Sequence, residues 1–318
     1  MRDAFALRWN ENRMIEATTI VQLQNGDGHV TLCPEIGAAI ARFTWKGHDI
    51  LRRAPDNAIA EKLVRQMGVY PLVPYSNRIG QAKLVVGDQT FSLRPNFMQE
   101  PHAIHGFGWQ RAWRVEKRSG DSAVLRLEHT PDADWPFACE ATQTVRVSTN
   151  ALYIALAVKN NDKRPMPAGL GFHPYFPLAP GTHLQAEWKG RWKMGADSLP
   201  TELGPVPMEA DFSQLRPVAG WKVDHCFTGW GRRAILDYPT HRMQLDASEA
   251  CRQIVVFAPN DDRNFIALEP VANINNAFAL AAKGVADTGM RMLKHGESLE
   301  ISMSITLSGR AATKAADA

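Results

Sequence analysis

Residues 299–308 form an alternating segment that constrains the fold more than any other part of the chain. Every odd position from Leu299 to Leu307 is apolar and every even position is polar. Because side chains of a β-strand point alternately to opposite faces of a sheet, this period of two predicts a strand with one buried and one solvated face. Such strands are typical of antiparallel sheets, where polar side chains can gather on the open face.

Further segments favour short strands joined by turns. Ala39–Trp45 precedes a turn at 46–49 and the apolar pair Ile50-Leu51, and residues 83–93 place a glycine turn between two apolar runs, so both read as hairpins. Strands are also expected at 123–129, 142–147 and 151–158. Helical periodicity is scarce, and only residues 57–67 fit a short helix. The sequence therefore predicts an all-β protein.

The length of 318 residues allows a substantial core. We expect one domain over residues 1–318, with a frayed tail from about residue 310 because the last residues lack large apolar side chains. Residues 179–217 are rich in Pro and Gly, which favours an excursion between strands over a linker to a second domain.

Charge and cysteine usage narrow the class of partner. The net charge of +3 is spread along the chain without a basic run, so we expect no nucleic acid and favour a small neutral ligand. No segment is long and apolar enough to cross a bilayer, and residues 1–12 lack the apolar run of a signal peptide. The cysteines are widely spaced without a CxxC pair, which predicts buried free thiols in a cytoplasmic protein. We expect the protein to be a monomer or a homodimer. They are Cys33, Cys139, Cys226 and Cys251.

Two histidines have settings that suit a ligand site. Pro174 follows His173 and biases it to an extended conformation at a strand end, where the imidazole is available for proton transfer. Gly106 and Gly108 follow His105 closely and would let a ligand approach the backbone. Either histidine could instead be a satisfied core residue.

Glu269 ends a mostly apolar strand and precedes Pro270. A carboxylate placed there could be partly desolvated, which would raise its pKa and make it a better base near neutral pH. It could equally form an ion pair at the end of the strand. Asp224 and Arg78 are likewise either ligand-binding groups or ordinary surface charges.

Other kinds of chemistry lack their sequence patterns. His102 and His105 are three residues apart, which on a strand points them to opposite sides, and there is no HExxH, so we expect no metal. A GxSxG nucleophile elbow and the glycine-rich phosphate loops are also missing from the sequence.

Five short motifs, taken in order, resemble the aldose 1-epimerase (galactose mutarotase) family. They are Asn77-Arg78-Ile79, His105-Gly106, His173-Pro174-Tyr175-Phe176, Asp224-His225 and Glu269. The resemblance extends from about residue 29 to residue 307. It implies a large antiparallel β-sandwich, the galactose mutarotase-like supersandwich.

The resemblance also implies roles for these residues. Glu269 would be the base and His173 the acid, Arg78 and Asp224 would hold sugar hydroxyls, and His105 would support the ring oxygen. Asn77 would belong to the same substrate-binding set.

The implied reaction suits this pair of groups. Interconverting the α and β anomers of an aldose requires removing the proton of the anomeric hydroxyl and protonating the ring oxygen, so that the ring opens and recloses without cofactor or metal. Ordinary pKa values of about 4.3 and 6.5 would let an ionised Glu269 coexist with a titratable His173 near neutral pH. We expect the two groups to face each other across a pocket about as wide as one sugar ring.

Departures from better-known galactose-active members leave the sugar open, because residues 275–278 read Asn-Asn-Ala-Phe. The substrate could be a free aldose or a modified one, such as a sulfonated or uronic sugar. Trp109 could stack on a pyranose ring or pack in the core.

Two alternatives to a mutarotase are a carbohydrate-binding protein without turnover and a hexose-phosphate epimerase of the same fold. The second would need an arginine cluster, for which the candidates are Arg52, Arg53, Arg94 and Arg111.

Overall fold

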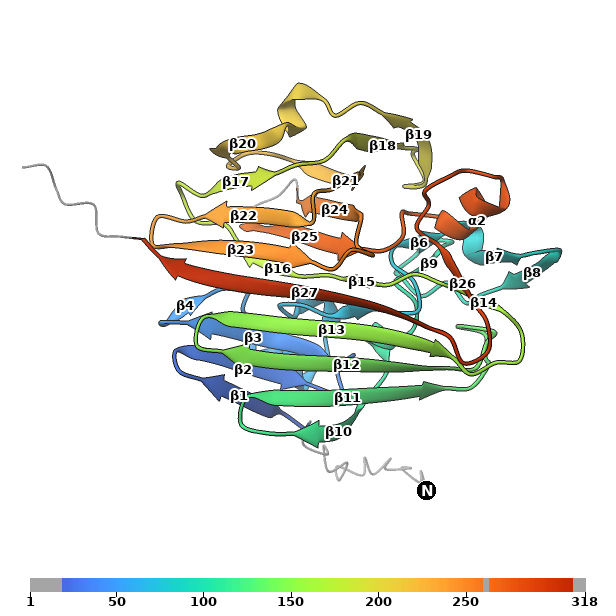
Figure 1. Cartoon of the computed structure of the whole chain (residues 1–318), viewed down its shortest axis with the longest axis horizontal. Helices are drawn as coiled ribbons and strands as arrows, with labels where there is room; N and C mark the ends of the chain where they lie inside the picture. Colours follow the sequence, from blue (N-terminus) through green and yellow to red (C-terminus); the bar gives the residue numbers. More distant parts are fainter. Residues whose placement is uncertain (1–18, 260–262, 311–318) are drawn as a thin grey trace, which may run out of the picture.

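A computed structural model describes residues 19–259 and 263–310 (Figure 1). One layer is a nine-stranded antiparallel sheet in the order β10-β11-β12-β13-β27-β23-β22-β17-β20. Its strands are β10 (Arg114–Arg118), β11 (Ser122–His129), β12 (Cys139–Ser148), β13 (Ala151–Asn160), β17 (His183–Ala186), β20 (Phe212–Pro217), β22 (Arg233–Asp237), β23 (His241–Ala247) and β27 (Ser298–Gly309).

Four of these strands confirm predictions. β11, β12 and β13 contain the segments 123–129, 142–147 and 151–158, and β27 contains the alternating segment 299–308. In β27 every odd-numbered residue from Leu299 to Leu307 is buried, and the even-numbered residues between them are partly or fully exposed. The period of two in the sequence therefore corresponds to a sheet with one buried face.

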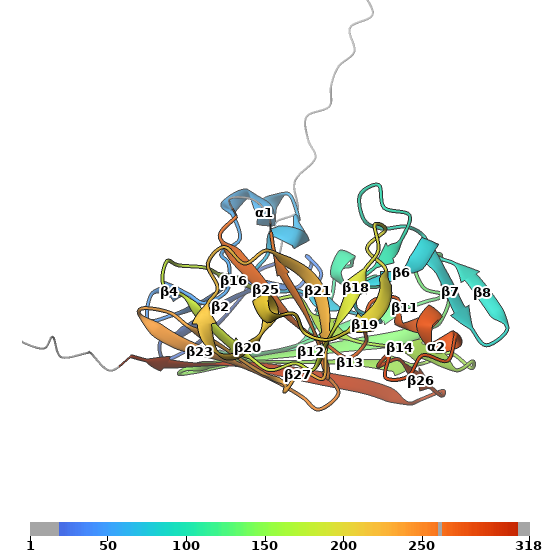
Figure 2. The same cartoon turned by 90° about the horizontal axis from the view of Figure 1, so that it is seen from above.

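An eight-stranded sheet lies over part of the first layer, as Figure 2 shows for β16, β21 and β25. The order is β19-β18-β21-β24-β25-β15-β5, and β16 pairs separately with β25. Its strands are β5 (Pro71–Leu72), β15 (Gly171–Phe172), β16 (Tyr175–Pro177), β18 (Gly190–Met194), β19 (Pro200–Gly204), β21 (Val223–Thr228), β24 (Gln253–Ala258) and β25 (Phe265–Val271).

The remaining strands form small sheets, and both predicted hairpins are among them. A four-stranded sheet in the order β1-β2-β3-β4 contains the first hairpin, whose return strand begins at His48, earlier than expected. The second hairpin pairs β7 with β8. The strands are β1 (Val21–Asn25), β2 (Gly28–Cys33), β3 (Ala39–Trp45), β4 (His48–Asp49), β6 (Arg78–Ile79), β7 (Lys83–Val86), β8 (Gln89–Ser92), β9 (Ala103–Ile104), β14 (Met166–Ala168) and β26 (Arg291–Leu293).

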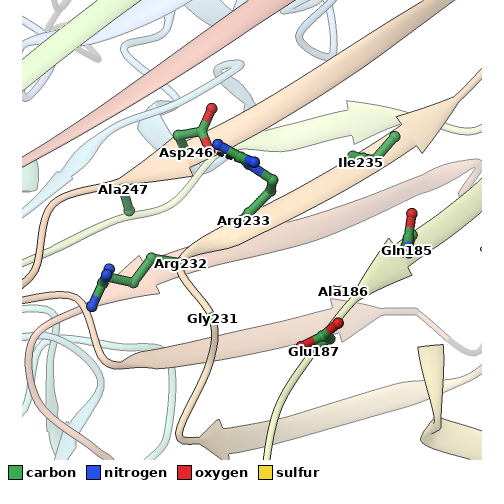
Figure 3. A pocket seen from close by; sticks show the side chains of 9 residues that line it. All are labelled: Gln185, Ala186, Glu187, Gly231, Arg232, Arg233, Ile235, Asp246 and Ala247. Atoms are coloured by element: carbon green, nitrogen blue, oxygen red, sulfur yellow. Dashed lines mark hydrogen bonds and ion pairs between the residues drawn. The ribbon is translucent and has the colours of Figure 1, made fainter. Parts of the chain in front are cut away.

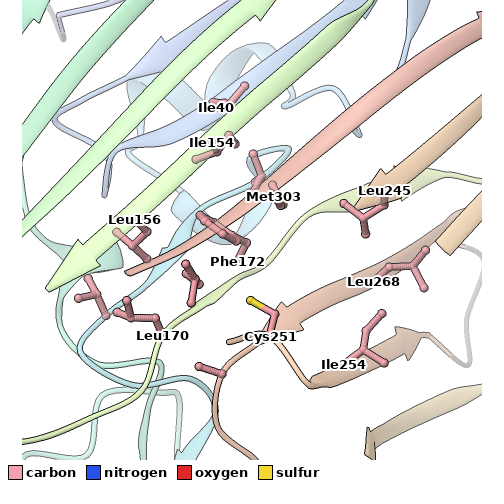
Figure 4. Close-up of a cluster of buried hydrophobic side chains, with 14 of the residues drawn as sticks. Ile40, Ile154, Leu156, Leu170, Phe172, Leu245, Cys251, Ile254, Leu268 and Met303 are labelled. Carbon is pink, nitrogen blue, oxygen red and sulfur yellow. The ribbon is translucent and has the colours of Figure 1, made fainter. Parts of the chain in front are cut away.

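The main core lies between the layers (Figure 4). Ile154 and Met303 contribute from the nine-stranded sheet, Ile254 and Leu268 from the eight-stranded sheet, and Ile40 from β3. Each is at most 2% exposed. Since burying an aliphatic side chain of this size stabilises a fold by roughly 1.5–3 kcal/mol, the stacking of the sheets is explained by this shared apolar surface. The predicted all-β sandwich is confirmed.

The helix predicted at 57–67 is wrong in extent. The chain forms only α1 (Asp56–Ala60) and a short 3-10 turn, because Lys62 adopts a left-handed conformation with φ +53° and ends the helical path. Only Ala58 of α1 is buried, so no long apolar helix face is needed. The other helical segments are α2 (Ala277–Ala282), η1 (Val64–Gln66), η2 (Gly80–Ala82), η3 (Gly108–Gln110) and η4 (Met208–Ala210).

Residues 179–217 are more regular than expected. They contain β17 and β20 of the nine-stranded sheet and β18 and β19 of the eight-stranded sheet, because the Pro and Gly turns separate short strands. At the other end, Arg310 pairs with Asp237 and so is not frayed. The rest of the predicted tail, 311–318, and the segment 1–12 considered for a signal peptide lie outside the described residues. That the chain is one domain stays a prediction.

The four cysteines are free and buried, as predicted. In the described part of the chain, neither helix has the length and apolar character that crossing a bilayer demands.

Candidate active site

Glu269 lies on the outer face of the eight-stranded sheet, away from the nine-stranded sheet. Its neighbour Leu268 belongs to the core between the sheets, so strand alternation turns Glu269 outward. Across the sheet, Glu269 is opposite Val255, and Val255 is opposite Cys226. Asp224 is two residues from Cys226 and therefore shares the outer face with Glu269.

His173 lies between β15 and β16 and contacts Glu269 directly. Its Nε2 is 3.3 Å from Glu269 Oε1 and 3.3 Å from the Tyr175 hydroxyl. The side chains of His173 and Glu269 are only 9% and 3% exposed. The structure thus brings the two predicted proton-transfer groups together, and the expectation of a sugar-wide gap between them is wrong.

Burial opposes a charge on either member of this pair. It raises the pKa of Glu269 well above its ordinary value, and the nearby Asp224 raises it further. Burial also lowers the pKa of His173 well below its ordinary value, aided by His105 and Arg52. In the protein alone we therefore expect a neutral carboxylic acid that donates to neutral His173, unlike the ionised base assumed from ordinary pKa values.

His105 is held by a reciprocal contact with Asn77. The Asn77 backbone N–H donates to His105 Nδ1 at 3.1 Å, and the His105 backbone N–H donates to the Asn77 carbonyl at 2.9 Å. Both residues are left-handed, with φ of +58° and +60°. Because Nδ1 accepts, the ring proton is on Nε2. Burial lowers the pKa of His105 to about 3, so the ring is a neutral donor whose centre is 5.5 Å from that of His173.

Arg78 links the remaining predicted residues. Its guanidinium donates to both carboxylate oxygens of Glu100, at 2.8 and 2.9 Å, and its backbone N–H donates to Asn77 Oδ1. Arg78 is close enough to lower the pKa of Glu269 and that of Asp224. The pKa of Asp224 is nevertheless raised, because surrounding protein desolvates it. The Asp224 side chain nevertheless remains accessible to solvent.

Two tyrosines beside His173 were not predicted as site residues. The hydroxyls of Tyr70 and Tyr175 are 3.1 Å apart, and the Tyr70 ring centre is 4.9 Å from that of His173. Burial raises the pKa of Tyr175 to about 12, so it keeps its proton. Trp109 stacks on Tyr70 at 5.9 Å and donates to the Gly106 carbonyl. At 3% exposed it packs in the core, which is one of the two predicted alternatives.

Several buried polar atoms around this pair have no hydrogen-bond partner among the described residues. They are His173 Nδ1, Glu269 Oε2, Asn275 Oδ1 and Trp192 Nε1. Buried polar groups are normally paired, so such a concentration indicates a place where ligand hydroxyls would complete the bonding.

Cys226 connects Asn275 and Trp192 to the site. The Asn275 backbone bonds the Cys226 thiol, and the register places Trp192 next to Cys226 on the outer face. Burial raises the pKa of that thiol to about 12, so it is no nucleophile. Trp192 gives no local sequence signal, whereas Asn275 was visible as a departure from the family pattern.

His102 serves a different purpose from His105. Its Nδ1 accepts from the Gln81 backbone N–H and its Nε2 contacts the Asp197 carbonyl, both at 3.0 Å. Within residues 19–259 and 263–310, no three His, Cys, Asp or Glu side chains are grouped to hold a metal ion.

A recess of about 510 Å³ elsewhere on the molecule does not share these features (Figure 3). It lies over β17, β22 and β23, on the face of the nine-stranded sheet opposite the core. Its Arg233 is paired with Asp246 at 2.6 Å, and Gln185 donates to the Ser213 carbonyl.

Comparison with known proteins relates this geometry to a family. The family model described as aldose 1-epimerase matches residues 19–306. The uncharacterized Escherichia coli protein YphB is 29% identical over 264 residues, covering 80% of this chain and 88% of YphB.

Two solved structures share the fold. A putative aldose 1-epimerase from Escherichia coli has a TM-score of 0.83 and 25% identity, covering 92% of this chain and 99% of that one. A galactose 1-epimerase from Lactobacillus acidophilus has a TM-score of 0.76 and 15% identity, covering 92% and 95%. At 15% identity the second likeness shows the fold alone.

Proposed function

Because this chain belongs to the aldose 1-epimerase family, we propose that it is a mutarotase, an isomerase that interconverts the α and β anomers of an aldose. Glu269 is the base and His173 the acid in this proposal. The observation that carries it is the 3.3 Å contact between these two buried side chains on the outer face of the sheet.

The contact distance suits the reaction better than a wide gap would. The anomeric hydroxyl oxygen and the ring oxygen are bonded to the same carbon, so the groups that deprotonate one and protonate the other must lie side by side. A sugar placed over the pair presents its anomeric hydroxyl to Glu269 and its ring oxygen to His173. General acid–base catalysis requires hydrogen-bond distance to both atoms.

The pair shares one proton, and its position decides reactivity. With the proton on His173, Glu269 is a carboxylate base and the imidazolium is an acid. Arg78 favours this arrangement by lowering the pKa of Glu269, whereas burial and the nearby Asp224 oppose it. During ring opening, Glu269 takes the hydroxyl proton while His173 gives its proton to the ring oxygen. Ring closure on either face of the aldehyde reverses both transfers and restores the enzyme.

Other residues of the site bind and position the sugar. His105 donates through its Nε2–H toward the ring oxygen, and Arg78 and Asp224 bind hydroxyls. Asn77 acts through its bonds to His105 and Arg78 as a positioning residue. We add Asn275 Oδ1 and Trp192 Nε1 as hydroxyl partners, because both are buried without a partner in the described chain.

The test is anomer exchange measured by NMR or polarimetry on freshly dissolved α-glucose and α-galactose. The wild-type protein should accelerate it, and Glu269→Gln should abolish the acceleration with the fold intact by circular dichroism. Glu300→Gln, an exposed carboxylate on β27, is the matched control and should exchange at the wild-type rate. An unchanged rate in Glu269→Gln would remove this carboxylate from the mechanism.

A further inference from the structure

A second recess, of about 820 Å³, opens beside the site and differs from it in charge. It is formed by the α1–η1 segment, the loop at 96–98, η3 and the start of β25. Its lining residues are Arg52, Arg53, Pro55, Lys62, Leu63, Val64, Arg65, Gln66, Asn96, Phe97, Met98, Trp109, Gln110, Arg263, Asn264 and Phe265. Five of these described residues are basic and none is acidic.

Among the described residues, carboxylates compensate the charges of Arg53 and Lys62 only weakly. Arg53 is 3.9 Å from Asp56 and Lys62 is 3.7 Å from Glu35, and neither carboxylate lines the recess. The Arg65 guanidinium lies over the Phe97 ring, 5.0 Å from its centre. Exposed pairs of this separation contribute little, so Arg53 and Lys62 keep most of their positive charge in the recess.

Arg52 places a further positive charge between the recess and the catalytic pair. Its guanidinium lies 3.7 Å from the centre of the Tyr175 ring, and its Nη2 donates to the carbonyls of Arg65 and Met67. Its Nε is buried without a hydrogen-bond partner in the described chain. Arg52 also contributes to the lowered pKa of His173. A partly buried guanidinium with an unused donor is typical of a site that awaits an acceptor.

Tyr175 lies between the recess and the catalytic pair. Tyr175 contacts Arg52 on one side and His173 on the other. The loop that places Phe97 in the recess continues to Glu100, which holds Arg78 in the site. A group bound in the recess would thus lie one aromatic ring away from the reacting atoms.

We propose that the basic recess binds an anionic group carried by the substrate, a carboxylate, sulfonate or phosphate ester on the sugar carbon remote from the anomeric centre. The proposal rests on the proposed mutarotase function and names its substrate class as charged aldoses. Guanidinium groups bind the oxygens of such anions by paired, charge-assisted hydrogen bonds. It replaces the neutral ligand expected from overall composition.

Only part of the arginine cluster considered from the sequence lies here. Arg52 and Arg53 line the recess, whereas Arg94 and Arg111 both pair with Asp134 and do not line it. The cluster is completed by Lys62 and Arg65.

Anomer exchange on matched sugars tests the proposal. Glucuronate, glucose 6-phosphate and a 6-sulfonated glucose are compared with glucose, which separates the three possible anions. At least one charged sugar should be turned over with a kcat/KM about tenfold above that of glucose, and added salt should reduce only that advantage. Arg65→Gln should raise the KM of the preferred charged sugar about tenfold and leave glucose unchanged, as expected for one lost charge-assisted contact.

Two controls keep the result specific. Arg53→Gln should repeat the effect more weakly, while Arg233→Gln in the recess of Figure 3 should change neither sugar. Equal turnover of charged and neutral sugars, with Arg65→Gln indistinguishable from Arg233→Gln, would overturn the anion site and leave the mutarotase proposal standing.

A binding measurement tests the anion site independently of the proposed mutarotase activity. The melting temperature of Glu269→Gln should rise with the charged sugar and not with glucose at the same concentration, and Arg65→Gln should remove that rise. If no sugar is turned over but this binding pattern is found, the mutarotase proposal fails and the anion site stands. Absence of any charged-sugar binding to wild type and Glu269→Gln alike would overturn the anion site.

Discussion

The two faces of the eight-stranded sheet are built by the same strands and yet have opposite character. On the inner face, Ile254 and Leu268 are fully buried among other apolar side chains. On the outer face, one residue away, Glu269 is also buried, but its Oε2 has no partner in the described chain, and the same holds for His173 Nδ1 and Asn275 Oδ1. Burial alone therefore does not mark the core, whereas buried atoms with unused bonding capacity mark the site.

Along one strand, inner-face residues contribute to stability and outer-face residues to the site. Apolar contacts of the inner face stabilise the fold whether or not a ligand is bound. Polar atoms of the outer face cost stability until a ligand pairs with them, which is a common feature of functional sites. Substitutions on the two faces should therefore have different effects, and four experiments test this.

The largest effect is expected from His173→Asn on the outer face. Loss of the general acid should lower kcat for anomer exchange by about a hundredfold or more while the melting temperature stays close to wild type. His295→Asn, at an exposed histidine, is the matched control. A change confined to KM would show that His173 only binds a hydroxyl.

Ile254→Ala is the corresponding change on the inner face. The cavity should cost about 2 to 5 kcal/mol in the free energy of unfolding, measured by urea denaturation, with the exchange rate per folded molecule unchanged. Glu269→Gln should give the reverse result, no loss of stability and no activity. Similar losses of stability in Ile254→Ala and Glu269→Gln would show that the two faces do not differ in their contribution to stability.

Lowering the pH should reduce the stability of the folded protein through His105. The pKa of His105 is lowered from 6.5 to about 3 by burial, so between these values the unfolded chain binds a proton that the folded chain does not. Stability is therefore lost as pH falls through this window, by on the order of a few kcal/mol at pH 4. Glu269 acts in the opposite sense, because its raised pKa favours the folded state as pH falls toward 4.5.

A comparison with His105→Gln isolates the histidine. Urea denaturation at pH 7.5 and pH 4 should show a smaller acid-induced loss in His105→Gln than in wild type. Equal losses in the two proteins would mean that His105 does not stay neutral when folded.

The smallest effect is expected from Tyr175→Phe. It removes the hydroxyl that contacts His173 and Tyr70 but keeps the ring under Arg52. One net hydrogen bond is worth about 1 kcal/mol, so the rate of exchange should fall about fivefold. A fall as large as that of His173→Asn would make Tyr175 part of the acid itself.

Local patterns were enough to predict strands but not the helix. The alternation in β27 and the turns of β7–β8 are properties of neighbouring residues, and the structure confirms them. Residues 57–67 also have helical spacing, yet the left-handed Lys62 divides them. Whether such spacing forms a helix depends on whether a partner surface covers it, and periodicity does not contain that information.

The site could be predicted only through the family resemblance. His105, His173 and Glu269 lie far apart in the sequence, and no local rule places them in one cluster of buried side chains. The direct contact of His173 with Glu269, the buried donor of Trp192 and the grouping of Arg52 with Arg65 could not be predicted either. Each depends on desolvation or proximity created by tertiary packing.

Strand β25 puts Leu268 and Glu269 on consecutive positions, and this limits how the protein can evolve. Inserting or deleting one residue just before them would exchange their directions, turning the carboxylate into the core and the leucine toward the outer face. Insertions in the surrounding loops carry no such penalty. Loop length can thus vary without turning these side chains, while this strand tolerates replacement but not a change of length.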